Sequence, residues 1–261
     1  MMYAILRLES SRLLRPSALL VGLFALVAAF LFAAFPGFAD EAELLDEAMP
    51  PVLEAFFGFE EIHTIEGFVA GYAYPLVWIL FAGIFFAYVS AGTISREVSE
   101  RQMDLTLSNP VSRESVVLQK IGALWVPLVV LNVGMVAIVL VGAAILGESI
   151  DPVVLVAAHL LSVPYLLVCA GIGLVFSVVI DRVASAQVGA LGAVFVLWLM
   201  EGIAEMSPDY EWVGAVSPHR YYDPSAILVH EEYAVGDAGI LLAGFLVLVA
   251  VATVIFARRD L

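Results

Sequence analysis

Six apolar stretches, most of about 20 residues and almost free of charge, constrain this chain more than any other feature of its sequence. A helix needs about 20 such residues to cross the hydrocarbon core of a bilayer. The stretches lie approximately at residues 17–35, 69–94, 121–146, 153–180, 188–200 and 238–257. The fifth runs a few residues further, and its outer end must be short, tilted or broken because Glu201 and Glu205 arrive early. The pattern predicts an all-α integral membrane protein with six transmembrane helices.

The composition excludes most soluble classes. Hydrophobic residues make up 62% of the 261 and charged residues 14%, whereas a soluble domain carries about 25% charged residues. The single cysteine, Cys169, excludes a disulfide framework and every cysteine-based zinc site. A net charge of −15 argues against nucleic-acid binding, which needs a basic surface.

The basic residues predict the orientation, since Lys and Arg are retained on the cytoplasmic side of a membrane. With the amino terminus inside, ten of the eleven basic residues are cytoplasmic and only Arg220 lies outside. We therefore expect a multi-pass protein of the cell (plasma) membrane with both termini cytoplasmic. Nineteen of the 26 acids fall in outer segments, and the chain has one lysine. This favours a surface adapted to high salt, as in a halophilic archaeon, over an outer face that concentrates cations.

One transmembrane domain is expected over residues 1–261, with the first apolar stretch as a span. Its 19 residues exceed the usual core of a secretory signal, about 7–15 residues. Residues 1–15 predict a short amphipathic helix on the inner surface, although an ordinary basic flank explains them equally well. Residues 36–67 form an acidic outer segment whose helical pattern is interrupted by Pro50-Pro51.

The second large outer segment, residues 201–237, contains pairs of an N-cap residue and a proline, which are typical of helix starts. These pairs are Ser207-Pro208, Ser217-Pro218 and Asp223-Pro224. We expect short helices here that re-enter the edge of the membrane between the fifth and sixth spans.

The only sizeable inner loop, residues 95–120, is predicted to form an elbow. Asn109-Pro110 should end a helix arriving from the second span, and Ser112 can cap a new one that reaches the membrane at Lys120. The loop is also too apolar for a plain solvated linker, through Met103, Leu105, Leu107 and Val111. Such a surface is typical of a contact with a protein partner.

The elbow contains Glu100, Asp104-Leu105, Leu107-Ser108, Pro110-Val111-Ser112-Arg113 and Lys120. This set of residues resembles the corresponding loop in permeases of type 2 ATP-binding-cassette transporters. The run from Ser217 to Tyr222 and the ending from Phe256 to Leu261 look similar too. Within the family, the chain is similar to a prokaryotic subgroup that includes the permease for maturation of nitrous oxide reductase. It departs from the pattern at Arg101-Gln102, where Gly-Thr is common, and at Thr106, where leucine is usual.

The resemblance implies a membrane-spanning permease that couples ATP hydrolysis on a separate ATPase subunit to translocation of a substrate, and we expect export. It implies two permease chains, as a homodimer or a related pair, embedded in membrane lipids. The residues expected to couple the permease to the ATPase are Glu100, Arg101, Asp104, Pro110, Val111, Ser112, Arg113 and Lys120. Among them, Pro110 and Ser112 would set the elbow and Lys120 would anchor its return to the membrane.

The chain itself carries no hydrolase motif. A phosphate-binding loop needs a glycine before its lysine, and the only lysine, Lys120, follows Gln119. We therefore expect no catalytic residue, metal or cofactor on this chain, with ATP and magnesium on the partner ATPase. An ion- or proton-coupled carrier is the main alternative, in which His159, the only histidine inside a span, would relay protons. A buried histidine with ordinary partners is the simpler interpretation, and a passive membrane anchor for a partner protein is the third possibility.

Overall fold

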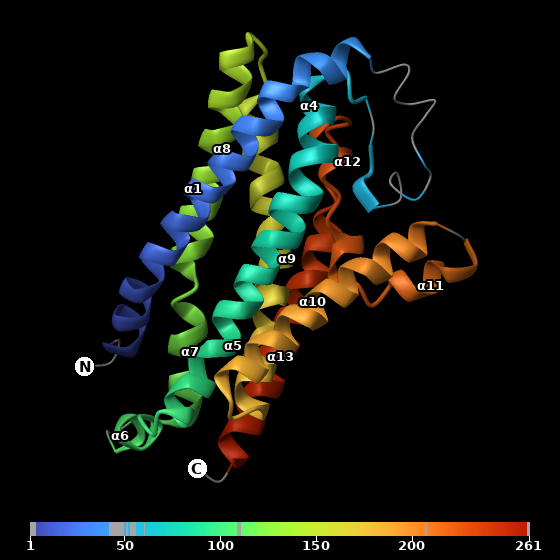
Figure 1. The fold of residues 1–261 in the computed structure, drawn as a ribbon. Helices are drawn as coiled ribbons and strands as arrows, with labels where there is room; N and C mark the ends of the chain where they lie inside the picture. Colours follow the sequence, from blue (N-terminus) through green and yellow to red (C-terminus); the bar gives the residue numbers. More distant parts are fainter. Residues whose placement is uncertain are drawn as a thin grey trace.

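The computed structural model describes residues 4–41, 50, 52, 56–59, 61–108, 111–206 and 208–259. Within these ranges it contains helices and no strands (Figure 1). Six helical segments are long and apolar enough to cross a membrane. They are Ala4–Asp40 (α1), Ile65–Ser99, Arg113–Leu146, Pro152–Val179 (α9), Val183–Glu205 (α10) and Val235–Arg258 (α13). For the described residues, the expected all-helical fold with six candidate transmembrane helices is thus confirmed.

Two of the six segments form the centre of the bundle. The apolar window of Ile65–Ser99 is 67% buried and that of α9 is 56% buried, against 22% in each of the other four. Helix α9 makes its largest contacts with α13 and with α5, Gly83–Ser99, which is the last part of the second segment. The approach of α5 to α9 is close because Gly173 has no side chain, and a Cβ there would overlap the backbone of Ala87. The outer four segments keep apolar faces for lipid or for other chains.

The second and third segments are each built from several helices. The second begins with α4, Ile65–Phe68, continues as the π-helix η1, Val69–Ala82, and ends as α5. Pro75 lies inside η1 and lacks the N–H that a regular helix would use. The third consists of α7, Arg113–Gly122, and α8, Trp125–Leu146.

The amino-terminal helix differs from the prediction of a separate element over residues 1–15. Helix α1 runs from Ala4 to Asp40 without interruption and includes Pro16. The hydroxyl of Ser17 donates to the carbonyl oxygen of Leu13 at 2.7 Å, so polar groups remain paired beside the proline. The expected boundary near residue 15 is therefore wrong, because the chain passes from the basic turns into the apolar turns within one helix.

The connection between α10 and α13 contains four short helices. They are Pro208–Tyr210 (η2), Glu211–Gly214 (α11), Pro218–Tyr221 (η3) and Pro224–Leu228 (α12). Ser217 caps η3 and Asp223 caps α12, each through a side-chain oxygen that accepts backbone N–H groups. Helix α10 runs from Val183 to Glu205, a few residues past Met200, and its C-terminal half diverges from the bundle towards α11 (Figure 1).

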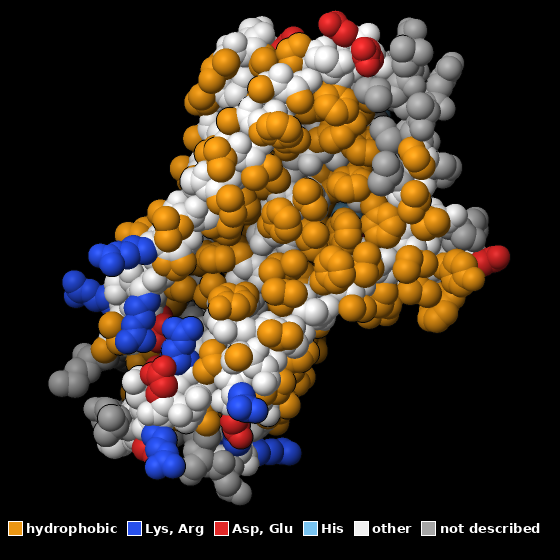
Figure 2. All heavy atoms as spheres, in the orientation of Figure 1, with side chains coloured by type: hydrophobic (Ala, Val, Ile, Leu, Met, Phe, Trp, Pro, Cys, Tyr) orange, Lys and Arg blue, Asp and Glu red, His pale blue; other side chains and the backbone are white. Residues whose placement is uncertain are grey.

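Both ends of the described chain lie at the same end of the bundle, together with α6, Met103–Leu107, and α7 (Figure 1). Lys and Arg side chains gather at this end in Figure 2, below a broad apolar area. Part of the predicted acidic segment, residues 42–49, 51, 53–55 and 60, lies outside the described residues, and this part includes Pro51 of the proposed helix break. Asn109 and Pro110, which were expected to bend the elbow, lie outside them too.

Candidate coupling site

The elbow begins where α5 ends at Ser99. The amide of Gln102 donates to the carbonyl oxygen of Glu97 at 2.8 Å, and that of Arg101 donates to Val98 at 3.1 Å. This pair of bonds, with Arg101 at a φ of 56°, is a Schellman cap of the kind that usually has glycine in the left-handed position. The cap reverses the chain into α6, and Ser112 then caps α7 by accepting the amide of Ser115 at 3.2 Å.

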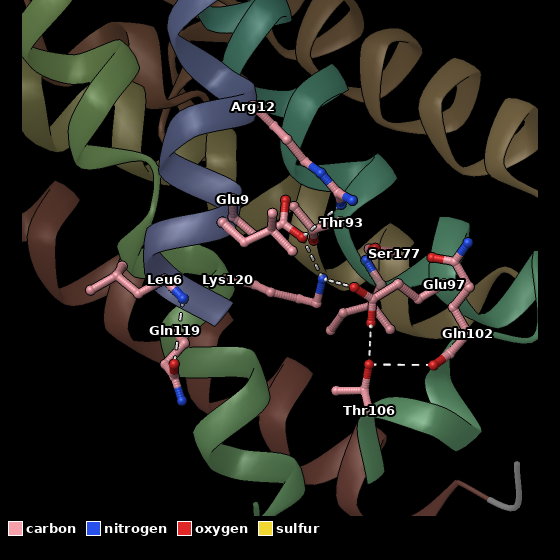
Figure 3. A network of polar contacts seen from close by, with 12 residues as sticks. Leu6, Glu9, Arg12, Thr93, Glu97, Gln102, Thr106, Gln119, Lys120 and Ser177 are labelled. Carbon is pink, nitrogen blue, oxygen red and sulfur yellow. Dashed lines mark hydrogen bonds and ion pairs between the residues drawn. The ribbon is translucent and has the colours of Figure 1, made fainter. Parts of the chain in front are cut away.

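A buried ion-pair cluster fastens the elbow to the membrane helices (Figure 3). The side chain of Lys120 in α7 is fully buried, and its Nζ lies 2.7 Å from Oε1 of Glu97 in α5 and 3.1 Å from Oε1 of Glu9 in α1. Glu97 also accepts the hydroxyl of Thr106 in α6 at 3.4 Å. Three helices therefore meet at one cation, and α6 joins them through Glu97. A buried lysine is stable only when it is paired in this way.

Two further hydrogen bonds hold α1 against the return of the elbow. The backbone amide of Leu6, in the first turns of α1, donates to Oε1 of Gln119 at 3.4 Å. The indole N–H of Trp125 donates to the hydroxyl of Ser10 at 3.1 Å. The amides of a first helical turn have no partner within the helix, so Gln119 supplies one to α1.

The other end of α7 is tied to the carboxyl end of α13. Nη1 of Arg113 donates to the carbonyl oxygens of Phe256 at 3.1 Å and Ala257 at 3.4 Å, and also to that of Arg259. Its guanidinium lies 5.8 Å from the centre of the Phe256 ring. The last carbonyls of a helix lack partners and carry partial negative charge, which an arginine neutralises well.

Arg259 extends this connection to α9. It donates from Nη1 to the carbonyl oxygen of Val178 at 2.8 Å and forms an ion pair with Asp181. The elbow is thus linked to α1 and α5 through Lys120, and to α13 and α9 through Arg113 and Arg259.

The eight residues predicted to couple the permease to an ATPase fall into different environments. Glu100, Arg101 and Asp104 are exposed at the tip of the elbow. Val111 and Arg113 are half-buried, Ser112 is the helix cap, and Pro110 lies outside the described residues. Lys120 is buried. Among the described members of this set, the charged residues at the tip and Ser112 are exposed and can meet another protein without rearrangement.

Sequence reasoning missed Glu9, Glu97, Thr106 and Gln119 as members of the cluster. A signal for the burial of Lys120 was present, because Val116, Val117 and Lys120 share one face of a helix at a spacing of three and four residues. That face is buried in the structure. Nothing in the local sequence marks Glu9 or Glu97 as its partners.

His159 has the ordinary partners of a buried histidine. Its Nε2 lies 2.8 Å from the hydroxyl of Tyr74, and its Nδ1 lies 3.2 Å from Oδ1 of Asn132. Asn132 in turn donates to the carbonyl oxygen of Leu128 at 2.7 Å. Both ring nitrogens are therefore engaged within the bundle.

A sequence model described as ABC-2 family transporter protein matches residues 3–261, which is nearly the whole chain. The chain belongs to the ABC-2 transporter family. As an ABC-2 permease it is a multi-pass membrane protein and the membrane component of an ATP-binding-cassette transporter. The family implies association with an ATPase subunit of that class, and its permeases are generally not catalytic themselves. A search among curated proteins found no significant match.

In this ABC-2 permease the elbow lies at the bundle end that carries both termini and the gathered basic side chains (Figures 1 and 2). Membership of the family supports the transporter interpretation over the carrier and the passive anchor.

Proposed function

We propose that the exposed tip of the elbow docks on the ATPase subunit and that the buried cluster around Lys120 transmits its movement to the spans. The observation that carries this proposal is the bridging position of Lys120 between Glu9 and Glu97. A movement imposed on α6 and α7 cannot leave α1 and α5 behind without separating a buried cation from its carboxylates, which is costly. Glu100, Arg101 and Asp104 supply charges that a protein surface can recognise.

Arg113 is a second transmission point in this proposal. It joins α7 to the end of α13, which packs along α9 in the centre of the bundle. Movement of the elbow would therefore reach α1 and α5 through Lys120, and α13 and α9 through Arg113 and Arg259. ATP and magnesium would bind the ATPase subunit, and this chain would supply no catalytic residue.

Several finer features complete the proposal. The distribution of basic residues supports cytoplasmic termini, and the prokaryotic resemblance supports a location in the cell membrane, with the acid-rich composition favouring a halophilic archaeon. The same resemblance supports a second permease chain and export. The narrower likeness, to the subgroup with the nitrous-oxide-reductase maturation permease, rests on the elbow motif. The scarcity of charge in the spans suits a lipidic or amphipathic cargo.

The test is to co-purify the permease with its ATPase subunit and to measure ATPase activity with and without the permease in liposomes. The double variant Glu100→Lys/Asp104→Lys should abolish co-purification. Glu148→Lys, a charge reversal of an exposed acid in the connection between α8 and α9, is its matched control and should leave binding intact.

Arg113→Glu should insert into the membrane and bind the ATPase, but the permease should no longer change ATPase activity. Unchanged coupling in Arg113→Glu would contradict the transmission route. Equal loss of binding in Glu148→Lys would contradict the docking surface, and cargo movement by the permease alone would support the carrier instead.

A further inference from the structure

A groove of about 450 Å³ opens beside the Lys120 cluster, between the first turns of α1 and the last turns of α5. Arg12, Leu13 and Pro16 line it from α1, and Tyr88, Val89 and Arg96 line it from α5. The volume is in the range of about 300–1,000 Å³ that small-molecule sites occupy. Glu9 and Glu97 of the Lys120 cluster and Glu100 of the elbow tip also line the groove, but neither the docking surface nor the transmission route accounts for its two arginines.

The groove presents two guanidinium groups. The side chain of Arg12 is 56% exposed, and its only ion pair among the described residues is a long one of 3.5 Å to Glu9. The guanidinium of Arg96 has no hydrogen bond or ion pair within the part of the chain that the structure describes. Its Nη2 would lie 3.5 Å from a Cβ at Gly92, so the guanidinium folds back along α5 across the glycine. Both cations therefore remain available to a ligand.

The carboxylates that line the groove already have partners. Glu9 and Glu97 share the ammonium of Lys120, and Glu100 accepts a hydrogen bond from Nε2 of Gln102 at 2.9 Å. Lys120 balances only one of these three carboxylates, so the groove is close to neutral overall, and Arg12 and Arg96 are its cations without a short ion pair. Guanidinium groups bind the oxygens of a phosphate in a bidentate manner, which gives both strength and orientation.

The position of the groove distinguishes a lipid phosphate from a free one. Leu13, Pro16 and Val89 give it an apolar side, and Tyr88 is 46% exposed beside them. Tyrosine is typical of the level of the headgroups, where a ring can be apolar at one end and wet at the other. Figure 2 shows the basic side chains gathered below a broad apolar area on this face of the protein. A ligand that contacts both the basic side chains and the apolar surface beside them needs a phosphate joined to acyl chains.

We propose that the groove between α1 and α5 binds a membrane phospholipid, with its headgroup phosphate on Arg12 and Arg96 and its acyl chains along Leu13 and Val89. This inference needs only that the chain spans a membrane, and it does not depend on the proposed coupling to an ATPase. A bound lipid at this place would lie between two of the helices that Lys120 joins.

The test is native mass spectrometry of the full-length protein in detergent, titrated with dioleoylphosphatidylglycerol. Arg12→Gln/Arg96→Gln should weaken binding of the first lipid by about tenfold or more, because two charge-assisted contacts are removed. Arg15→Gln, in an exposed side chain of α1 outside the groove, is the control for loss of a nearby positive charge and should change binding less than about twofold. Arg12→Lys/Arg96→Lys keeps the charge and should give an intermediate affinity.

Two comparison ligands identify the source of the phosphate. Dioleoylglycerol, which lacks the phosphate, should bind without dependence on Arg12 and Arg96, and inorganic phosphate at millimolar concentration should not displace the phospholipid. Equal weakening by Arg15→Gln, or equal affinity for dioleoylglycerol, would overturn the site. Displacement of the lipid by inorganic phosphate would overturn the lipid and assign the groove to a soluble phosphate compound.

Discussion

The ammonium of Lys120 lies 2.7 Å from a carboxylate oxygen of Glu97, and no part of the lysine side chain is exposed to solvent. The two residues belong to α7 and α5, on either side of the elbow. The pair therefore closes the elbow at its base, while the tip stays exposed.

Lys120→Met should lower the free energy of unfolding by about 3–5 kcal/mol, since two buried carboxylates lose their cation. The triple variant Lys120→Met/Glu9→Gln/Glu97→Gln should recover most of this loss, because it removes the uncompensated charges as well. Arg12→Met is the control, and its exposed ion pair should contribute at most about 1 kcal/mol. Thermal unfolding in detergent measures all three, and a stable Lys120→Met protein would contradict the structural role of the cluster.

Arg101→Gly should raise the free energy of unfolding by about 1 kcal/mol. Arg101 occupies the left-handed region with a φ of 56°, where a Cβ is unfavourable and glycine is not. Glu100→Gly is the matched control, because its φ of −89° gives glycine no such advantage and the variant should be destabilised. A lower melting temperature in Arg101→Gly than in the parent would show that the arginine side chain stabilises the turn by other contacts.

Gly173→Ala should destabilise the bundle by about 1–3 kcal/mol, because the new Cβ meets the carbonyl of Ala87 and α5 must move away from α9. Gly192→Ala in α10 provides the comparison, since a Cβ there meets nothing within 4 Å. That variant should be neutral or slightly stabilising, as alanine favours a helix over glycine. Equal melting temperatures for the two variants would contradict the close approach of α5 and α9.

Acid should destabilise the short helices between α10 and α13 through His219. Burial lowers the pKa of His219 to about 4, and its Nδ1 has no hydrogen-bond partner within the described chain. The unfolded chain binds the proton near pH 6.5 and the folded protein only near pH 4, so the free energy of unfolding falls as pH drops through this window.

The expected loss is about 2 kcal/mol between pH 7 and pH 4. His219→Gln should remove that part of the pH dependence, whereas His63→Gln, in an exposed side chain, should retain it. The test is to measure the free energy of unfolding of the parent, His219→Gln and His63→Gln at a series of pH values. An unchanged pH profile for His219→Gln would exclude this histidine as the source of the acid sensitivity.

Much of the fold could be predicted locally. The positions of the six spans follow from the length of apolar helix that a bilayer requires, and Ser112, Ser217 and Asp223 begin helices because their side chains cap nearby amides. The end of the predicted amino-terminal helix was wrong, because Pro16 is accommodated inside α1 and no local rule distinguishes a kinked helix from two separate ones.

Local sequence is enough to predict six candidate membrane spans and one apolar elbow, because hydropathy, proline and capping residues act within a few residues of chain. The contacts of the elbow's cations depend instead on how distant helices pack. Glu9 is 111 residues from Lys120, and the carbonyl of Phe256 is 143 residues from Arg113. From the sequence alone, any carboxylate or helix end on the same side of the membrane could pair with the arginine or lysine. The packing of α1, α5 and α13 selects the partner, because a buried cation must be paired where it lies.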